Sequence, residues 1–273
     1  MRRLILSMVL ACVGSTGQAS DRFNLEACAD PGLEPSRTIQ FCRKALQDRK
    51  LKPMLRAQVL GNLAYAMAAT GLHEDAIVNY RLAIATDPRL MQAYTNMARS
   101  NEALERFREA MANYQAALDV NRRWVDAWAG RGALLLRQGR PEVALNDLSQ
   151  ALRLAPGNHD ARYNRGIAAI DVGDLPLAEE DFSYLIARAP EDAGAYVNRG
   201  RARAELGDFS KALRDLDQGI EISPEWAWAY FVRGRVNDAK GDVERADQDF
   251  LRAYELGFSN PWLIERVRKI SGS

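Results

Sequence analysis

The chain has 273 residues, of which 47% are apolar and 27% charged, a composition that is typical of a soluble folded protein and argues against disorder. Its 37 Lys and Arg residues balance 36 Asp and Glu residues, so no net field draws it to nucleic acid or to an acidic membrane. We therefore expect no nucleic-acid partner, and recognition that depends on local contacts.

Residues 1–19 have the three parts of a secretory signal peptide. Arg2 and Arg3 are basic, residues 4–13 are apolar, and Gly17-Gln18-Ala19 offers a cleavage site of small residues. The apolar run is shorter than the roughly 20 residues that span a bilayer. We therefore predict secretion to the bacterial periplasm, with the signal removed after Ala19.

A second interpretation of this segment remains open. Val9-Leu10-Ala11-Cys12 resembles a bacterial lipobox, although Leu10 is unusual at its place. Lipidation at Cys12 would make the protein an anchored outer-membrane lipoprotein. Only in that case do we expect the protein to associate with a membrane.

Cleavage after Ala19 would leave two cysteines, Cys28 and Cys42, an even pair that can close a short loop. A disulfide across about 15 residues stabilises a protein by about 3 kcal/mol in the chain-entropy model. An oxidising compartment permits such a bond. We therefore predict a structural disulfide between these two residues.

Residues 20–56 are expected to cap the N-terminal end of a repeat array, whose terminal apolar face needs a cover. TIQFCRKAL at 38–46 matches AIVNYRLAI at 76–84 column for column, with Cys42 in the column of Tyr80. This match predicts a half repeat. The disulfide would pin the preceding segment, through Cys28, onto that helix.

From residue 57 the sequence repeats with a period of 34 residues. Small residues occupy positions 8 and 20 of each repeat, and a large apolar residue occupies position 24. Position 15 is Gly except in the second repeat, where Glu105 replaces it. Because Gly suits the left-handed turn that ends a helix, each repeat predicts a helix, a Gly turn and a second helix. The six blocks are 57–90, 91–124, 125–158, 159–192, 193–226 and 227–260.

Positions 7 and 23 of the repeat change together. In the first two blocks position 7 is apolar and position 23 is Asn, whereas the last four blocks have Arg and Asp. In an antiparallel helix pair that turns at position 15 these positions lie opposite each other, so Arg should bind Asp across each hairpin. The alternative, four arginines that await an acidic ligand, is weaker because each block supplies a matching acid. The predicted pairs are Arg131–Asp147, Arg165–Asp181, Arg199–Asp215 and Arg233–Asp249.

The columns resemble the tetratricopeptide repeat (TPR) family over about three quarters of the chain. The family pattern is large at position 4, small at 8, Gly at 15, Ala at 20, aromatic at 24 and Pro at 32, and the second block departs from it at 15 and 32. The resemblance implies an all-α fold, a right-handed superhelical solenoid of antiparallel helix pairs. It also implies that the first helices line a concave groove that binds a protein or an extended peptide.

The resemblance places the groove contacts at positions such as 2, 5, 6, 9, 12 and 13 of each repeat. Asn recurs at position 6, and an Asn ladder can pair with a peptide backbone because Asn both donates and accepts. Alternatively, these side chains only bond a neighbouring turn. Tyr163, Trp228 and Phe231 offer apolar footing, although such aromatic residues are also often core. The candidate groove residues are Asn62, Asn96, Asn164, Asn198, Arg99, Arg201 and Arg235.

Residues 261–273 are expected to form a C-terminal capping helix. Ser259-Asn260-Pro261 is a helix start signal, and an amphipathic segment follows it. We expect Trp262, Ile264 and Val267 to pack against the last block.

The sequence contains no pattern that indicates catalysis. His73 and His159 are far apart and have no Cys or acid at metal-ligand spacing, and no nucleotide-binding or nucleophile motif occurs. We therefore expect no enzyme activity, no cofactor and no metal.

The function we predict is a protein- or peptide-binding scaffold of the bacterial cell envelope. Its rival is the lipoprotein, which would help to assemble a secretion, pilus or cell-wall complex. An enzyme with a site in the groove and a nucleic-acid-binding protein are the other classes.

Overall fold

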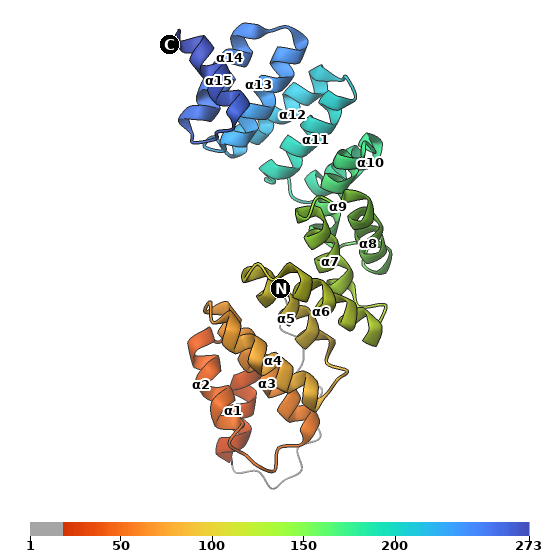
Figure 1. Ribbon diagram of the computed structural model, residues 1–273, viewed down its shortest axis with the longest axis vertical. Helices are drawn as coiled ribbons and strands as arrows, with labels where there is room; N and C mark the ends of the chain where they lie inside the picture. Colours follow the sequence, from red (N-terminus) through yellow and green to blue (C-terminus); the bar gives the residue numbers. More distant parts are fainter. Residues whose placement is uncertain (1–18, 273) are drawn as a thin grey trace. The chain divides into compact units, whose positions relative to one another are not determined.

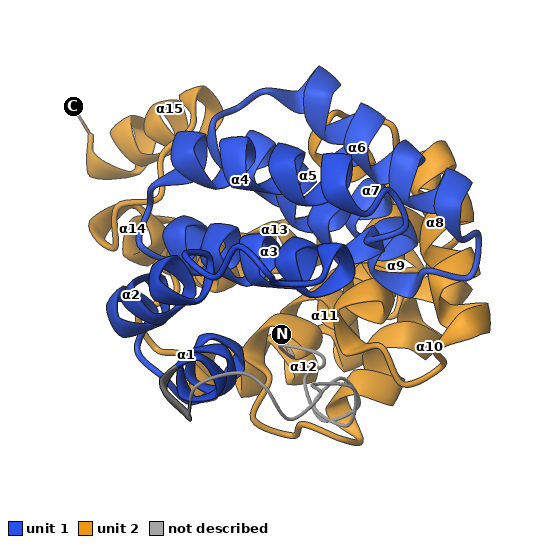
Figure 2. Ribbon diagram, turned by 90° about the horizontal axis from the view of Figure 1, so that it is seen from below, with its two compact units in different colours: residues 1–134 blue, residues 135–273 orange. Residues whose placement is uncertain are grey.

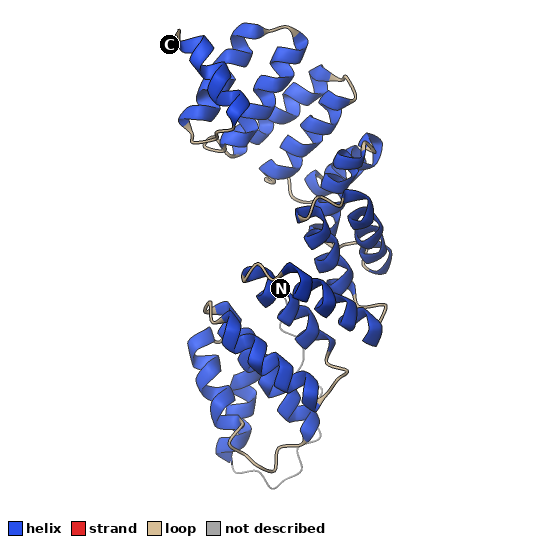
Figure 3. Cartoon of the chain, viewed as in Figure 1, coloured by secondary structure: helices blue, strands red, loops and turns tan. Residues whose placement is uncertain are grey.

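The computed structural model describes residues 19–272, and within that range the regular structure consists of fifteen α-helices without a β-strand (Figures 1 and 3). The helices pack in consecutive pairs, which confirms the predicted all-α repeat fold. No described helix is both long and apolar enough to cross a membrane. The predicted signal sequence, apart from Ala19, and the alternative lipidation site Cys12 lie outside the described residues.

The chain divides into two units, residues 1–134 and 135–273, and the division falls within helix α7 (Figure 2). The helices that begin in the first unit are α1 (Ala19–Ala29), α2 (Pro35–Ala45), α3 (Pro53–Ala69), α4 (His73–Thr86), α5 (Met91–Ala103), α6 (Phe107–Val120) and α7 (Val125–Arg137). Those of the second unit are α8 (Pro141–Leu154), α9 (His159–Val172), α10 (Leu175–Ile186), α11 (Ala193–Glu205), α12 (Phe209–Ile222), α13 (Ala227–Lys240), α14 (Val243–Glu255) and α15 (Pro261–Ser271). In blocks two to six, the first helix begins at the first residue of the block.

In the first unit the N-terminal cap is a helix pair. Helix α2 contains the predicted half repeat, and the segment before it forms α1, which packs on α2 and also touches α3. This arrangement extends the predicted half repeat to two helices. Cys28 and Cys42 are placed for a disulfide, with their Cα atoms 4.8 Å apart, and both are buried in the core of this unit.

The second unit repeats one packing scheme. Each helix packs on the next in sequence, and the first helices of neighbouring repeats, α9, α11 and α13, also touch in turn. Within this unit the second helices α10, α12 and α14 make no comparable contact with one another. The first helices of neighbouring repeats are therefore closer together than the second helices, and this row bends toward the first-helix face.

Small residues allow the two helices of a repeat to approach closely. A Cβ atom added to Gly166 would lie 2.7 Å from the ring of Phe182, and one added to Gly234 would lie 2.7 Å from Phe250. Both aromatic rings are fully buried. The small column at position 8 and the large column at position 24 are thus two sides of one contact.

The turn between the two helices uses a residue with positive φ. Gly173 has a φ of 82° and Gly241 a φ of 88°, whereas the non-Gly residue Glu105 is held at 58°. The following Asp caps the second helix, since Asp208 accepts a hydrogen bond from the N–H of Lys211 at 3.1 Å. Asp174 and Asp242, which also follow the turn Gly, cap α10 and α14 in the same way.

Helix α15 covers the last repeat, as expected for a cap, and its buried face includes a residue that was not predicted. Leu263 is fully buried and Val267 is 9% exposed, whereas Trp262 remains 43% exposed. Asn260 caps the helix by accepting from the N–H of Leu263 at 2.8 Å. Trp262 contacts the rings of Phe231 and Phe250, as predicted, and the fully buried Leu263 is the packing residue that the prediction missed.

Candidate ligand-binding pocket between helices α11 and α13

A pocket of about 300 Å³ opens between the first helices of the last two repeats, α11 and α13, in the second unit. Ligand pockets in proteins typically measure about 300–1,000 Å³, so this one is at the small end of the range. Its lining residues are Arg201, Ala204, Glu205, Phe209, Trp228, Phe231, Val232, Arg235, Val236 and Ala239.

An aromatic cluster supports the apolar wall of the pocket. The ring of Phe231 lies 5.4 Å from Trp228, 4.8 Å from Phe258 and 6.0 Å from Trp262, measured between centroids. Phe231 is itself 7% exposed, so its ring is fixed by neighbours on several sides. Such offset and edge-to-face contacts favour one arrangement of the rings. The wall is therefore ordered without a ligand.

Two arginines and Glu205 give the pocket its charge, and the two arginines differ in their partners. Arg201 donates to Asp171 at 3.3 Å and to Glu205 at 3.2 Å. Arg235 is exposed, and its guanidinium lies 5.3 Å from the ring centroid of Trp262. Among the described residues no carboxylate forms an ion pair with Arg235. The pocket thus carries one matched and one unmatched cation.

Only some of the predicted groove residues lie at the pocket. Arg201 and Arg235 come together at the pocket. Asn62 on α3 and Asn96 on α5 are half-buried and belong to the first unit, as does Arg99, whose side chain has polar contacts of its own.

The Asn positions of the second unit are used within the protein. Asn164 donates to the carbonyl of Asp160 one turn earlier, at 2.9 Å. Asn198 is only 6% exposed and donates to the hydroxyl of Tyr163 and to the carbonyl of Gly194, both at 2.9 Å. The amide N–H groups of Asn198 thus already link two neighbouring repeats, and its contact with a ligand stays a prediction.

The pocket contains residues that the sequence analysis did not select. Val232 and Val236 are buried and Phe209 is half-buried at the start of α12. They have the apolar character and helical spacing of core residues, so the sequence gives no signal that they border a cavity. Trp228 and Phe231, noted as possible apolar footing, do line it.

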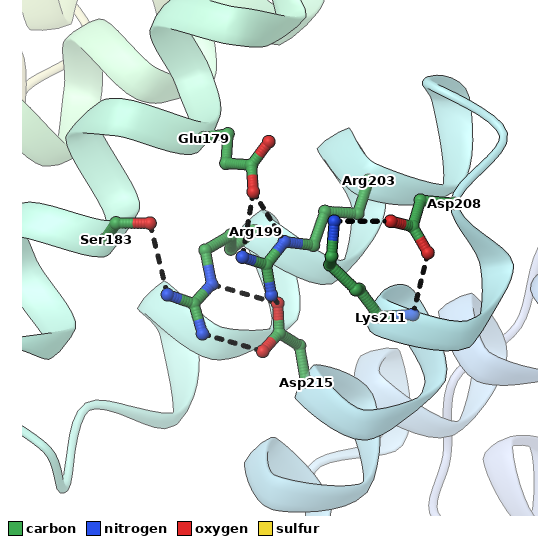
Figure 4. Close-up of polar contacts among 7 residues, drawn as sticks. All are labelled: Glu179, Ser183, Arg199, Arg203, Asp208, Lys211 and Asp215. Atoms are coloured by element: carbon green, nitrogen blue, oxygen red, sulfur yellow. Dashed lines mark hydrogen bonds and ion pairs between the residues drawn. The ribbon is translucent and has the colours of Figure 1, made fainter.

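Ion pairs and hydrogen bonds of Arg199 and Arg203 connect α11 to neighbouring helices (Figure 4). Arg199 donates to Asp215 from Nε at 2.9 Å and from Nη2 at 2.7 Å, and its Nη1 donates to Ser183 of the previous repeat at 3.1 Å. Arg203 joins Glu179 and Asp215, each at 2.8 Å. Helix α11 is thereby tied to both of its neighbouring second helices.

The same bond pattern recurs in the repeats on either side. Arg165 donates twice to Asp181 at 2.7 Å, and hydrogen bonding to this carboxylate raises the pKa of Arg165 above its usual value. Arg233 donates to Asp249 at 2.7 Å and to Asp217 of the preceding repeat at 2.7 Å.

The two residues of the fourth predicted pair, Arg131 and Asp147, belong to different units, and this pair remains a prediction. Asp147 is buried, at 5% exposure. Arg131 donates to Gln115 of the preceding repeat.

Comparison with known families decides the classification. The family model described as tetratricopeptide repeat matches four overlapping stretches, residues 95–159, 131–193, 163–225 and 197–261, which together span more than half of the chain. The chain belongs to the tetratricopeptide repeat family. No curated protein matches the sequence of this TPR protein.

Solved structures of similar fold are themselves TPR proteins or related helical proteins. A TPR protein from Parabacteroides merdae is 23% identical over 94% of this chain and 100% of its own, with a TM-score of 0.64. YrrB, a TPR protein described as having an unusual peptide-binding site, is 26% identical over 69% of this chain and 95% of its own, with a TM-score of 0.59. PilW, a type IV pilus biogenesis factor, is 18% identical over 79% of this chain and 98% of its own, with a TM-score of 0.66.

This TPR pocket combines apolar side chains with two guanidinium groups and the carboxylate of Glu205. Across residues 19–272 no cluster of His, Cys, Asp and Glu is placed to hold a metal ion. The arrangement supports recognition of a partly apolar ligand.

Proposed function

We propose that this TPR protein is a non-catalytic scaffold of the bacterial cell envelope that binds an extended segment of another protein on its first-helix face. TPR proteins bind peptides or proteins, and the peptide-binding site described for YrrB supports the same role here. The observation that carries the proposal is the pocket between α11 and α13, which lies between two first helices and is lined by apolar side chains and arginines.

The polar side chains on the first-helix face differ in how accessible they are to a ligand. Arg235 is exposed at the pocket. Asn164 is half-buried on α9, in the repeat that precedes the repeat of α11. Asn198, between them, is buried, so ligand contact there passes through neighbouring side chains. We infer that the pocket, and not a continuous Asn ladder, provides the main anchor.

The envelope location is the second part of the proposal. It rests on the signal-like residues 1–19 and on Cys28 and Cys42, which are placed for a disulfide that an oxidising compartment would maintain. A second candidate is the lipoprotein form, which the lipobox-like segment ending at Cys12 supports. The mass of the mature protein separates them: a chain that starts at Ser20 excludes the lipoprotein, and diacylglycerol on Cys12 establishes it.

Photo-cross-linking in the producing cells tests the binding proposal. A photoreactive amino acid at Ala204, which lines the pocket, should give a discrete cross-linked product with another protein. The same group at Arg245, an exposed residue on the second helix α14, is the matched control and should give none. Equal products from both positions, or none from Ala204, would refute binding at the first-helix face.

A further inference from the structure

We propose that the pocket between α11 and α13 binds an internal segment of a partner protein that carries one large apolar side chain and a nearby Asp or Glu. The apolar side chain fills the pocket and the acidic side chain pairs with Arg235. This inference rests on the proposed function and adds the chemistry of the ligand to it.

The size and lining of the pocket select the apolar part of the ligand. A volume of about 300 Å³ is too small for most cofactors and suits one large side chain. Phe231, Val232 and Val236 give it an apolar surface, and Trp228 adds an aromatic face. An aromatic or branched aliphatic side chain gains most from such a surface, because the free energy of burial grows with apolar area.

The charges at the pocket select the acidic part. Arg201 is occupied by Asp171 and Glu205, so its guanidinium has little capacity for another carboxylate. Arg235 forms no ion pair among the described residues, and its guanidinium lies on the Trp262 ring. A guanidinium on an aromatic face keeps its N–H edges available. Glu205 does not neutralise Arg235, because it accepts from Arg201. An anionic group therefore finds its partner at Arg235.

The position of Arg235 favours a side-chain carboxylate over the carboxyl terminus of a partner. Capture of a chain terminus needs several donors that converge on one carboxylate, either free backbone N–H groups or several Arg and Lys side chains. Arg201 and Arg235 lie in the interior of α11 and α13, where backbone N–H groups are engaged in the helix. One guanidinium fork without such N–H groups matches a single acidic side chain.

The pocket is also prepared for binding before the ligand arrives. The aromatic cluster fixes Phe231, and the bonds of Arg203 to Glu179 and Asp215 fix α11. Groups that are already ordered lose little conformational freedom on binding, which favours affinity. A short segment can therefore bind specifically through two side chains.

Selection from random peptides tests the inference on the intact mature protein. One library is displayed as an internal segment of a carrier protein, and a second presents the same peptides with a free carboxyl terminus. Peptides recovered from the internal library are then synthesised, labelled and titrated by fluorescence anisotropy. The recovered sequences should share a large apolar residue and a nearby Asp or Glu.

Three variants separate the pocket from the rest of the surface. Arg235→Gln should weaken binding by about tenfold or more, the loss expected when a charge-assisted bond is removed. Ala239→Trp, at an exposed position that lines the pocket, should abolish binding by filling it while thermal unfolding stays cooperative. Arg214→Gln, at an exposed position on α12, is the matched control and should leave the affinity unchanged.

A double-mutant cycle identifies the contact itself. Changing the acid of the peptide to its amide should weaken binding to the wild type and cause no further loss in Arg235→Gln. Peptides without an acid, peptides that need a free carboxyl terminus, or an Arg235→Gln variant of full affinity would overturn the inference and leave the proposed function intact. Failure to recover any peptide, together with absent cross-links from Ala204, would overturn both.

Discussion

Arg199 and Asp215 form a two-bond ion pair across the hairpin of α11 and α12, with N–O distances of 2.9 and 2.7 Å. The side chain of Arg199 is 15% exposed and that of Asp215 is 6% exposed, so solvent screens the pair only weakly. Arg199 also reaches Ser183 in the preceding repeat. One residue therefore joins the two helices of its own repeat and links that repeat to the one before it.

Loss of the charge on Asp215 should destabilise the fold. Asp215→Asn leaves Arg199 and Arg203 without their shared carboxylate, and an uncompensated buried charge costs about 3–5 kcal/mol. We expect the free energy of unfolding, measured by urea denaturation, to fall by about 3 kcal/mol, because the Asn oxygen still accepts one bond. A melting curve equal to that of the wild type would mean that the pair is solvated.

The double variant Arg199→Leu with Asp215→Asn should regain much of that loss. The first repeat already combines an apolar residue at position 7 with Asn79 at position 23, and Asn79 donates to the carbonyl of Asp75 at 2.9 Å. Arg203 keeps Glu179 as its partner in the double variant. Additive losses from the two substitutions would contradict this expectation, because coupled residues should deviate from additivity by about 0.5–3 kcal/mol.

Glu105 should be a site where Gly stabilises the protein. It is held at a φ of 58° in the turn between α5 and α6, a left-handed conformation that costs a non-Gly residue about 1–2 kcal/mol. Part of that gain is offset by the greater freedom of Gly in the unfolded chain. Glu105→Gly should therefore raise the free energy of unfolding by up to about 1 kcal/mol in urea titrations. The contrasting change Glu102→Gly, inside α5, should lower it, because it weakens the helix and removes the acceptor of the Tyr114 hydroxyl.

Most of the fold could be predicted from the period of 34 residues, because the fold depends on contacts within one repeat and between adjacent repeats. The helix pairs, the Gly turns and the Arg–Asp pairs all follow from residues that recur at fixed positions of the repeat. The buried residues of α15 could not all be predicted in this way, since no second copy of the cap exists in the chain. Trp262 is the larger apolar residue, yet Leu263 is the one that is fully buried.

The candidate site was predictable only in part, because it depends on differences between repeats. Arg201 and Arg235 share position 9, and the sequence places both on the first-helix face. Glu205 accepts from Arg201, and Arg235 forms no ion pair among the described residues, a difference that spacing alone does not determine. Likewise the burial of Asn198 depends on Tyr163, whose hydroxyl reaches it from the preceding repeat.

Gly166 should resist substitution because its lack of a side chain lets α9 approach α10. Gly166→Ala would put a Cβ 2.7 Å from the buried Phe182 ring, and overpacking of this kind costs about 1–3 kcal/mol. The higher helix propensity of Ala returns up to about 1 kcal/mol. We expect a net loss of about 1–2 kcal/mol in the free energy of unfolding, measured by urea denaturation followed by circular dichroism.

Gly157 provides the matched control in the same unit. A Cβ at Gly157 would meet no atom within 4 Å, and its backbone does not have the positive φ that L residues avoid. Gly157→Ala should therefore change the free energy of unfolding by less than about 0.5 kcal/mol or raise it slightly. If both variants unfolded alike, the close approach of α9 and α10 would have no energetic consequence.

Removal of the link between Cys28 and Cys42 should destabilise the N-terminal helix pair. The two residues join α1 to α2 across a sequence separation of 14, and the chain-entropy model gives about 3 kcal/mol for a loop of this size. Cys28→Ala with Cys42→Ala should therefore increase hydrogen exchange in α1 and α2, while α11 to α14 keep their protection. Titration of the purified mature protein under denaturing conditions should detect no free thiol, and two free thiols per chain would show that the bond does not form in the cell.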